Sequence, residues 1–204
     1  MCIKVVLDNV GKRFGDRSLF SRISAEIVSG HCLVVTGCNG SGKSTLLKII
    51  AGLIRPSTGQ VQFTLDNNTI IPKERTAYAG LVSPDMAMYK TLTGIENIIF
   101  WTTVCSIACS KLRAEELCNQ VGLGGAGSEQ VFTYSTGMRQ RLKFAVIQAV
   151  NPPVWLLDEP SSNLDERGKS MVKALITDAV KMNAVIIATN ETEEARYATS
   201  KIEL

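Results

Sequence analysis

Hydrophobic and polar positions along this 204-residue chain switch between the period of a strand and the period of a helix several times. Three short apolar runs, 33–36, 154–157 and 185–188, are typical of parallel strands that are buried on both faces. The alternation favours an α/β fold with a mainly parallel sheet and helices on both of its faces. The other predicted strands are 1–7, followed by a turn at 9–11, then 20–28 and 60–65; the predicted helices are one that ends at 51–52, then 93–122, 137–150 and 167–182.

Composition and charge narrow the possible classes of function. The chain is 45% hydrophobic and 20% charged, as in an ordinary globular protein, and its net charge of +3 is too small to argue for nucleic acid as a partner. The stretch that comes closest to a membrane span, 98–109, would cover about 18 Å as a helix, whereas a bilayer core is about 30 Å thick. The N-terminus lacks the layout of a signal peptide.

The six cysteines form no CxxC pair, and the single histidine, His31, is too isolated to complete a metal site. The spacing of Cys105 and Cys109 would let them face each other on a helix, but cysteine is more often a simple core residue. Without a signal peptide the protein is expected in the reducing cytosol. We therefore predict buried free thiols.

The most informative segment is 37–45, Gly-Cys-Asn-Gly-Ser-Gly-Lys-Ser-Thr, which links a predicted buried strand to a predicted helix. Glycines in such a turn let consecutive backbone N–H groups point at one spot, and the helix N-terminus adds its positive dipole. The lysine is expected to reach the β- and γ-phosphates, and the serine after it to bind Mg²⁺. The predicted contacts with a nucleoside triphosphate are Gly37, Asn39, Gly40, Ser41, Gly42, Lys43, Ser44 and Thr45.

Two carboxylates follow the apolar run 154–157. Asp158 is predicted to hold the same Mg²⁺ as Ser44, and Glu159 to orient or deprotonate an attacking water. Some 20 residues earlier, Ser135 and Gly137 open a predicted helix whose free N–H groups would form an anion site. Together these features predict phosphoryl-transfer chemistry.

In these motifs and their order, the chain resembles an ABC-type ATPase over essentially its whole length. Residues 37–45 match the Walker A motif, 134–140 resemble the signature motif, 155–159 the Walker B motif and 161–165 the D-loop. Phe14 occupies the place of the aromatic residue that stacks on adenine in that family. The compact length is similar to small export-type subunits, such as the haem-exporter ATPases of cytochrome c maturation.

The resemblance implies a single ABC ATPase domain over 1–204, a P-loop NTPase with an N-terminal antiparallel β subdomain and a small helical subdomain at about 84–140. It implies ATP and Mg²⁺ as ligands. It also implies a head-to-tail homodimer, or a heterodimer with a second ABC subunit, in which Ser135 and Gly137 close on the γ-phosphate held by the other subunit. A separate transmembrane subunit would place the chain in the cytoplasm, at the inner face of the cell membrane, and the small size favours export.

Two positions depart from the pattern of the family. Pro84 stands where the family has a glutamine that touches Mg²⁺ and the attacking water, and proline offers neither a side-chain amide nor a backbone N–H. Asn190, the second predicted catalytic residue, replaces a histidine; it can donate a hydrogen bond to the γ-phosphate but cannot carry a positive charge. Because Glu159 remains, we predict a functional ATPase with slow hydrolysis.

Three classes of function remain open. We favour the motor subunit of an ABC transporter; the alternatives are a nucleotide-gated module that barely hydrolyses ATP, which Pro84 and Asn190 permit, and a soluble ABC ATPase, which usually needs a longer chain. The apolar stretch 95–109 also has two interpretations. It is either the core of the helical subdomain or part of a surface that receives a helix of the membrane partner, together with Met86, Met88, Tyr89 and Trp101.

Overall fold

The computed structural model describes residues 2–204, so Met1 of the first predicted strand lies outside the described residues. The chain forms two compact units. The sheet unit comprises residues up to Ser83 together with Pro152–Glu159 and Ile176–Leu204, and the helical unit comprises Pro84–Asn151 and Pro160–Leu175. The helical subdomain expected at about 84–140 falls within the helical unit.

The first sheet of the sheet unit is antiparallel, with the strand order β2-β1-β4-β5. The turn predicted at 9–11 is wrong, because β1 continues through it. Asn9 has a φ of 48°, and the pairing register shifts between Leu7 and Val10, so an irregularity is absorbed within the strand. The strands are β1 (Ile3–Phe14), β2 (Arg17–Val28), β4 (Thr58–Leu65) and β5 (Asn68–Ile70).

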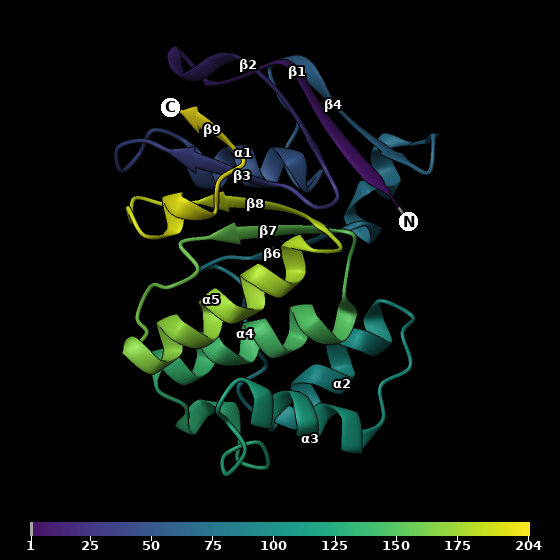
Figure 1. Ribbon diagram of the computed structural model, residues 1–204, viewed down its shortest axis with the longest axis vertical. Coiled ribbons are helices and arrows are strands. Elements are labelled where there is room, and N and C mark those ends of the chain that lie inside the picture. The colour runs from purple at the N-terminus through teal and green to yellow at the C-terminus, as the bar shows by residue number, and fades with distance from the viewer. Residues whose placement is uncertain (1) are drawn as a thin grey trace. The chain divides into compact units, whose positions relative to one another are not determined.

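The second sheet is parallel, with the strand order β6-β7-β8-β3-β9 (Figure 1). Its three inner strands are the three apolar runs, and β7 and β8 are buried at every position, as strands covered on both faces must be. The strands are β3 (Cys32–Thr36), β6 (Ala79–Val82), β7 (Val154–Asp158), β8 (Ala184–Ala188) and β9 (Ser200–Glu203).

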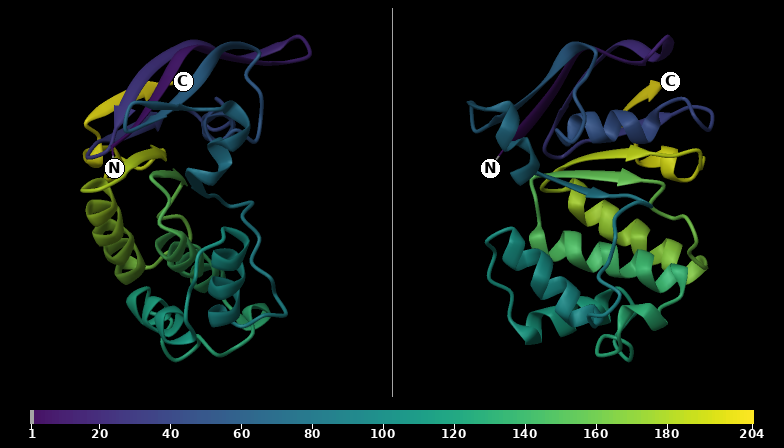
Figure 2. Two further views of the ribbon diagram at one scale, coloured as in Figure 1. Left: turned by 90° about the vertical axis from the view of Figure 1, so that its right-hand side faces the viewer. Right: turned by 180° about the vertical axis from the view of Figure 1, so that it is seen from behind.

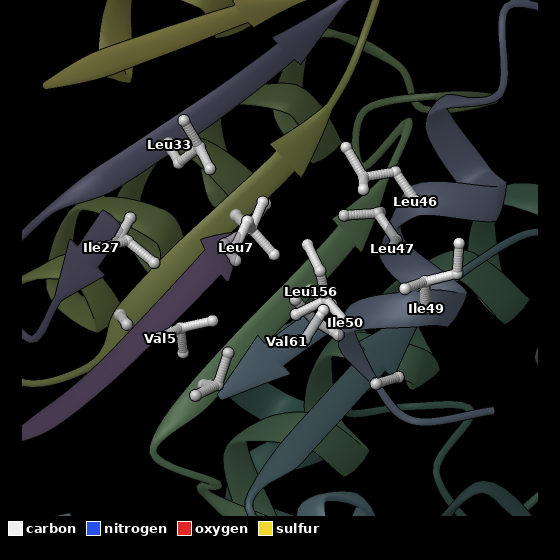
Figure 3. Close-up of a cluster of buried hydrophobic side chains, with 14 of the residues drawn as sticks. Val5, Leu7, Ile27, Leu33, Leu46, Leu47, Ile49, Ile50, Val61 and Leu156 are labelled. Atoms are coloured by element: carbon white, nitrogen blue, oxygen red, sulfur yellow. The ribbon is translucent and has the colours of Figure 1, made fainter. Parts of the chain in front are cut away.

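Helix α1 (Lys43–Ile50) anchors the core of the sheet unit. Its four apolar residues are fully buried, and they belong to one cluster with residues of both sheets (Figure 3). Each such side chain contributes about 1.5–3 kcal/mol when removed from water, so this face fixes the position of the helix and of the loop before it. The four residues are Leu46, Leu47, Ile49 and Ile50. Two short 3₁₀ helices, η1 (Pro72–Ala77) and η3 (Glu194–Tyr197), complete the unit.

The helical unit contains α2 (Gly94–Val104), α3 (Lys111–Gln120), η2 (Val131–Thr133) and α4 (Thr136–Val150), seen from two sides in Figure 2. The last helix, α5 (Glu166–Val180), begins in this unit and ends in the sheet unit. The single helix predicted at 93–122 is therefore two helices. The first ends near Ser106, whose φ of 58° is incompatible with an α-helix, and Ser110 caps the second.

All six cysteines are free thiols, but the prediction that they are buried holds only for Cys32 and Cys118. Burial raises the pKa of Cys32 to about 12 and that of Cys118 to about 11. Cys105 is exposed and lies beyond the end of α2, so it does not face Cys109 across a helix. Among the helices of residues 2–204, none combines the length and the apolar character that a membrane crossing requires.

Candidate functional site

A glycine-rich loop joins β3 to α1 in the sheet unit. Gly37, Gly40 and Gly42 have φ values of 145°, 82° and 108°, which side chains rarely adopt. A Cβ atom on Gly42 would also lie 2.7 Å from Leu19 and 2.8 Å from Phe20, so the loop packs tightly against β2. The backbone conformation therefore favours glycine at all three positions, and at Gly42 the surrounding space favours it as well.

Hydrogen-bond donors line this loop. The first amides of α1 have no partner within the helix, and its N-cap, Gly42, offers no side chain to satisfy them. Lys43 is only 6% exposed, and its Nζ atom donates to the carbonyl oxygens of Gly37 (2.7 Å) and Cys38 (3.3 Å). The Ser41 Oγ atom is buried without a protein partner. An array of amides, an ammonium and an unsatisfied hydroxyl fits a polyphosphate anion.

The parallel sheet gathers the other predicted residues of the site at one edge. Because β7, β8 and β3 are neighbours, their carboxyl ends meet beside the glycine loop. Asp158 is the last residue of β7 and only 4% exposed, while Ser44 lies in the first turn of α1. A hydroxyl and a carboxylate are oxygen ligands of the kind that Mg²⁺ takes, so these two residues fit that ion.

Glu159 follows Asp158 with an unusual backbone conformation. Its φ of 48° is left-handed, and its N–H donates to the Ala188 carbonyl oxygen at 2.9 Å. Left-handed residues other than glycine are strained, and such strain concentrates at functional sites. The hydrogen bond to the end of β8 holds Glu159 in this conformation.

Asn190 follows β8 at the same edge. Its Nδ2 atom donates to Asn39 Oδ1 at 2.7 Å, so the predicted catalytic amide is bonded to the glycine loop itself. His31 lies at the opposite end, since it precedes β3 and its carbonyl oxygen accepts from Val185 at the start of β8. No imidazole of the described chain is therefore placed at this edge of the sheet.

Phe14 lies at the tip of the β1–β2 hairpin and is 54% exposed. The hairpin belongs to the same unit as the glycine loop, and β2 packs against Gly42 through Leu19 and Phe20. An exposed aromatic ring near a phosphate loop is a suitable platform for a nucleobase.

Ser135 and Gly137 lie in the helical unit, at the start of α4. The Ser135 hydroxyl accepts from the Met138 amide at 3.2 Å and so caps the helix. A Cβ on Gly137 would be 3.0 Å from the Asn163 carbonyl oxygen, so the 161–165 segment lies close against it. The two residues line one hollow, together with Thr136, Met138, Arg141, Asn163, Leu164 and Asp165.

One interaction beside this hollow was not predicted. Arg141 pairs with Asp165 at 2.5 Å, and Asp165 also accepts from the Gly168 amide at 2.9 Å. The Gly168 hydrogen bond, followed by Arg141, holds the pKa of Asp165 below its usual value. The pair ties α4 to the loop before α5, and because the partners are 24 positions apart it leaves no signal in a single sequence.

Pro84 contributes a carbonyl oxygen, which accepts from Lys143 Nζ at 3.2 Å. Burial lowers the pKa of Lys143, whereas the nearby charge of Asp85 raises it. Pro84, which stands where the family has a glutamine, is thus bonded to α4 through its backbone carbonyl and not through a side chain.

Comparison with known proteins finds a matching family and related sequences. The family model described as "ABC transporter" matches residues 20–162. The cytochrome c biogenesis ATP-binding export protein CcmA of Rhizobium etli is 35% identical over 185 residues, which is 89% of this chain and 85% of that protein. The sulfate/thiosulfate import ATP-binding protein CysA of a Synechocystis strain is 35% identical over 205 residues; the alignment covers 98% of this chain but only 57% of that protein.

Solved structures agree with the sequence comparison. A dimeric ATP-binding cassette in a post-hydrolysis state, bound to ADP and phosphate, superposes with a TM-score of 0.85. The two chains are 26% identical, and the superposition covers 98% of this chain and 94% of the other. The α/β fold with an antiparallel and a parallel sheet is therefore the fold of ABC cassettes, as predicted.

Proposed function

This chain belongs to the ABC transporter family, and we propose that it is the ATP-hydrolysing subunit that drives one such transporter. The observation that carries the proposal is the sheet edge where the glycine loop, Asp158, Glu159 and Asn190 meet. Phosphoryl transfer depends on positioning and charge stabilisation, and this edge supplies the groups for both.

Each group has a defined task in this proposal. The loop amides and Lys43 bind the phosphates, and Lys43 exchanges its bonds to loop carbonyls for bonds to phosphate oxygens. Ser44 and Asp158 hold Mg²⁺, which when bound neutralises the charge that develops during transfer. Glu159 orients the attacking water and accepts its proton, and Asn190 donates a hydrogen bond to the γ-phosphate.

The two departures from the family pattern predict slow turnover. A neutral amide at Asn190 in place of a charge-assisted donor costs on the order of 1 kcal/mol, which is less than a tenfold loss of rate. Pro84 offers only its carbonyl oxygen, which Lys143 already occupies. These two positions permit the second candidate function, a nucleotide-gated module that barely hydrolyses ATP.

A head-to-tail dimer is the proposed assembly, either of two copies or with a second ABC subunit. Ser135 and Gly137 open α4 toward a hollow in the helical unit, where they would meet the phosphate held by the opposite subunit. Structurally similar cassettes are dimers, and one carries ADP and phosphate. One loop and one signature segment per chain suit a two-fold interface.

A separate membrane subunit is the proposed partner, with the chain held in the cytoplasm at the inner face of the membrane. Within 95–109, Ile98 is fully buried, as the core interpretation expects, and Val104 is 59% exposed and so available to a partner. Tyr89 is 47% exposed, and its ring packs edge-on against that of Phe100, with 4.5 Å between the ring centroids. The Phe100 ring packs edge-on against that of Trp101, with 5.7 Å between the centroids. This aromatic surface suits an amphipathic helix of the partner. Export remains the favoured direction, as in the CcmA relative.

Binding and turnover separate the candidate functions. Lys43→Met is expected to abolish binding of Mg-ATP, whereas Lys48→Met, on the same helix, is expected to retain it. Turnover is then compared between the native protein and Glu159→Gln, with and without the membrane subunit in liposomes. A native rate no faster than that of Glu159→Gln under both conditions would favour the weakly hydrolysing module over the motor.

A further inference from the structure

The Lys12 ammonium lies over the ring of Phe14, 4.7 Å from its centroid. Both residues are in the outer half of β1, two positions apart, so their side chains share one face of the strand. The register shift next to them inserts its extra residue, Leu19, in β2 and leaves this part of β1 regular. At this distance an ammonium is attracted to the ring face, so Lys12 and Phe14 form a cation–π pair.

The same ammonium is fixed by a second contact. Lys12 Nζ donates to the Arg55 carbonyl oxygen at 2.9 Å, in the segment that leads from α1 to β4. Further hydrogen bonds fasten the strand to that segment, because Ser57 N donates to Gly11 O at 2.7 Å and Arg13 N donates to Ser57 Oγ at 3.0 Å. Lys12 is therefore held at both sides, by the ring and by the backbone beyond the phosphate-loop helix.

Phe14 itself has little else to hold it. It is the last residue of β1, it pairs with Arg17 across the hairpin turn, and it is 54% exposed. An exposed aromatic side chain normally loses rotamer freedom when a ligand stacks on it, which weakens binding. Here the ammonium covers part of the ring and restricts it before any ligand arrives.

We propose that Lys12 is a positioning residue that holds the Phe14 ring ready to stack on a purine base. The inference rests on the proposed function and on the expectation, implied by the family resemblance, that Phe14 stacks on the base of the bound nucleotide. Lys12 acts through the ring and not on the phosphates, so its contribution depends on the base of the ligand. Its positive charge also draws electron density from the ring, which favours contact with an electron-rich purine.

Equilibrium binding of two probes tests the proposal. One is a non-hydrolysable ATP analogue with an imido bridge between the β- and γ-phosphates, and the other is inorganic tripolyphosphate, which has no base. Lys12→Met is expected to weaken binding of the analogue about two- to fivefold, the range that corresponds to an exposed cation–π contact, and to leave tripolyphosphate unchanged. Lys12→Arg retains a cation over the ring and is expected to bind like the native protein.

Two further variants complete the design. Lys4→Met removes another lysine of β1, one that pairs with Glu26 at 2.8 Å, and is expected to bind both probes normally. Phe14→Ala removes the platform, so adding Lys12→Met to it is expected to cause no further loss. Thermal melting of each variant confirms that the fold is intact.

The outcomes distinguish the proposal from its premise. If Phe14→Ala weakens binding of the ATP analogue but Lys12→Met does not, the positioning role of Lys12 is refuted and base stacking by Phe14 stands. Equal weakening of both probes by Lys12→Met would show a purely structural lysine and also refutes the role. If Phe14→Ala leaves binding of the ATP analogue unchanged, base stacking by Phe14 is refuted, and the positioning role of Lys12 is refuted as well.

Discussion

Glu159 combines a strained backbone with a predicted catalytic carboxylate, so its substitution should move stability and activity in opposite directions. At a φ of 48° a residue with a side chain is about 1–2 kcal/mol less favourable than in a right-handed conformation. Glycine avoids this strain but loses about 0.5–1 kcal/mol more backbone entropy on folding. The difference predicts that Glu159→Gly raises the free energy of unfolding by up to about 1.5 kcal/mol, or Tm by up to about 6 °C.

Glu159→Gln is the matched variant, because glutamine keeps the size and the backbone strain and removes only the charge. Its stability is expected to stay within about 0.5 kcal/mol of the native value. A positioned general base contributes about 10²- to 10⁴-fold to a rate, so both variants should hydrolyse ATP slower by that factor. The backbone hydrogen bond from residue 159 to Ala188 remains in both.

Single-turnover hydrolysis of Mg-ATP, with protein in excess, measures the chemical step, and urea unfolding measures stability. A Glu159→Gln protein that hydrolyses ATP at the native rate would show that this carboxylate does not accept the proton. A Glu159→Gly protein that is less stable than the native one by more than about 1 kcal/mol would refute the strain argument.

Three other predictions follow from local geometry. Gly59→Ala should lower the free energy of unfolding by about 3 kcal/mol or more, because φ is 72° and a Cβ would lie 2.3 Å from two carbonyl oxygens of β1. The control Gly125→Ala, whose Cβ would meet nothing within 4 Å, should change the free energy of unfolding by less than about 0.5 kcal/mol. Urea unfolding measures both. At pH 8 iodoacetamide should label the exposed Cys38, and bound Mg-ATP should protect it. Cys32 should stay unlabelled, because burial raises its pKa to about 12. Mass spectrometry detects the label at both positions. Asp165→Asn should lower Tm at pH 7, and the difference should shrink progressively as the pH falls below about 4, since a carboxyl whose pKa is depressed by a backbone amide and a neighbouring arginine loses its stabilising effect as it is protonated.

Contiguous features of this fold could be read from the sequence. The glycine loop, its strand and its helix are neighbours along the chain, so the period of the apolar residues was enough to predict where the strand and α1 lie. Asp158 was predictable for the same reason, because it ends an apolar strand. The roles of these residues in binding and catalysis stay predictions.

Long-range and irregular features left no such signal. The hydrogen bond from Asn190 to Asn39 joins residues 151 positions apart. Strand β6 has only four residues and its short apolar run contains a glycine, which weakens the strand signal, and β9 is an edge strand of mostly polar residues with no apolar run. The irregularity at Asn9 resembled a turn because a left-handed asparagine is typical of both.

The strand order also has a consequence for biosynthesis. Strand β3, which precedes the glycine loop, ends at residue 36, but its two neighbours, β8 and β9, lie at 184–188 and 200–203. During translation the loop therefore emerges long before either strand that pairs with β3. Such pairing of distant segments is slow and leaves apolar edges open meanwhile. A nascent chain stalled before residue 184 should be unable to retain nucleotide, and chaperones would find β3 exposed for most of its synthesis.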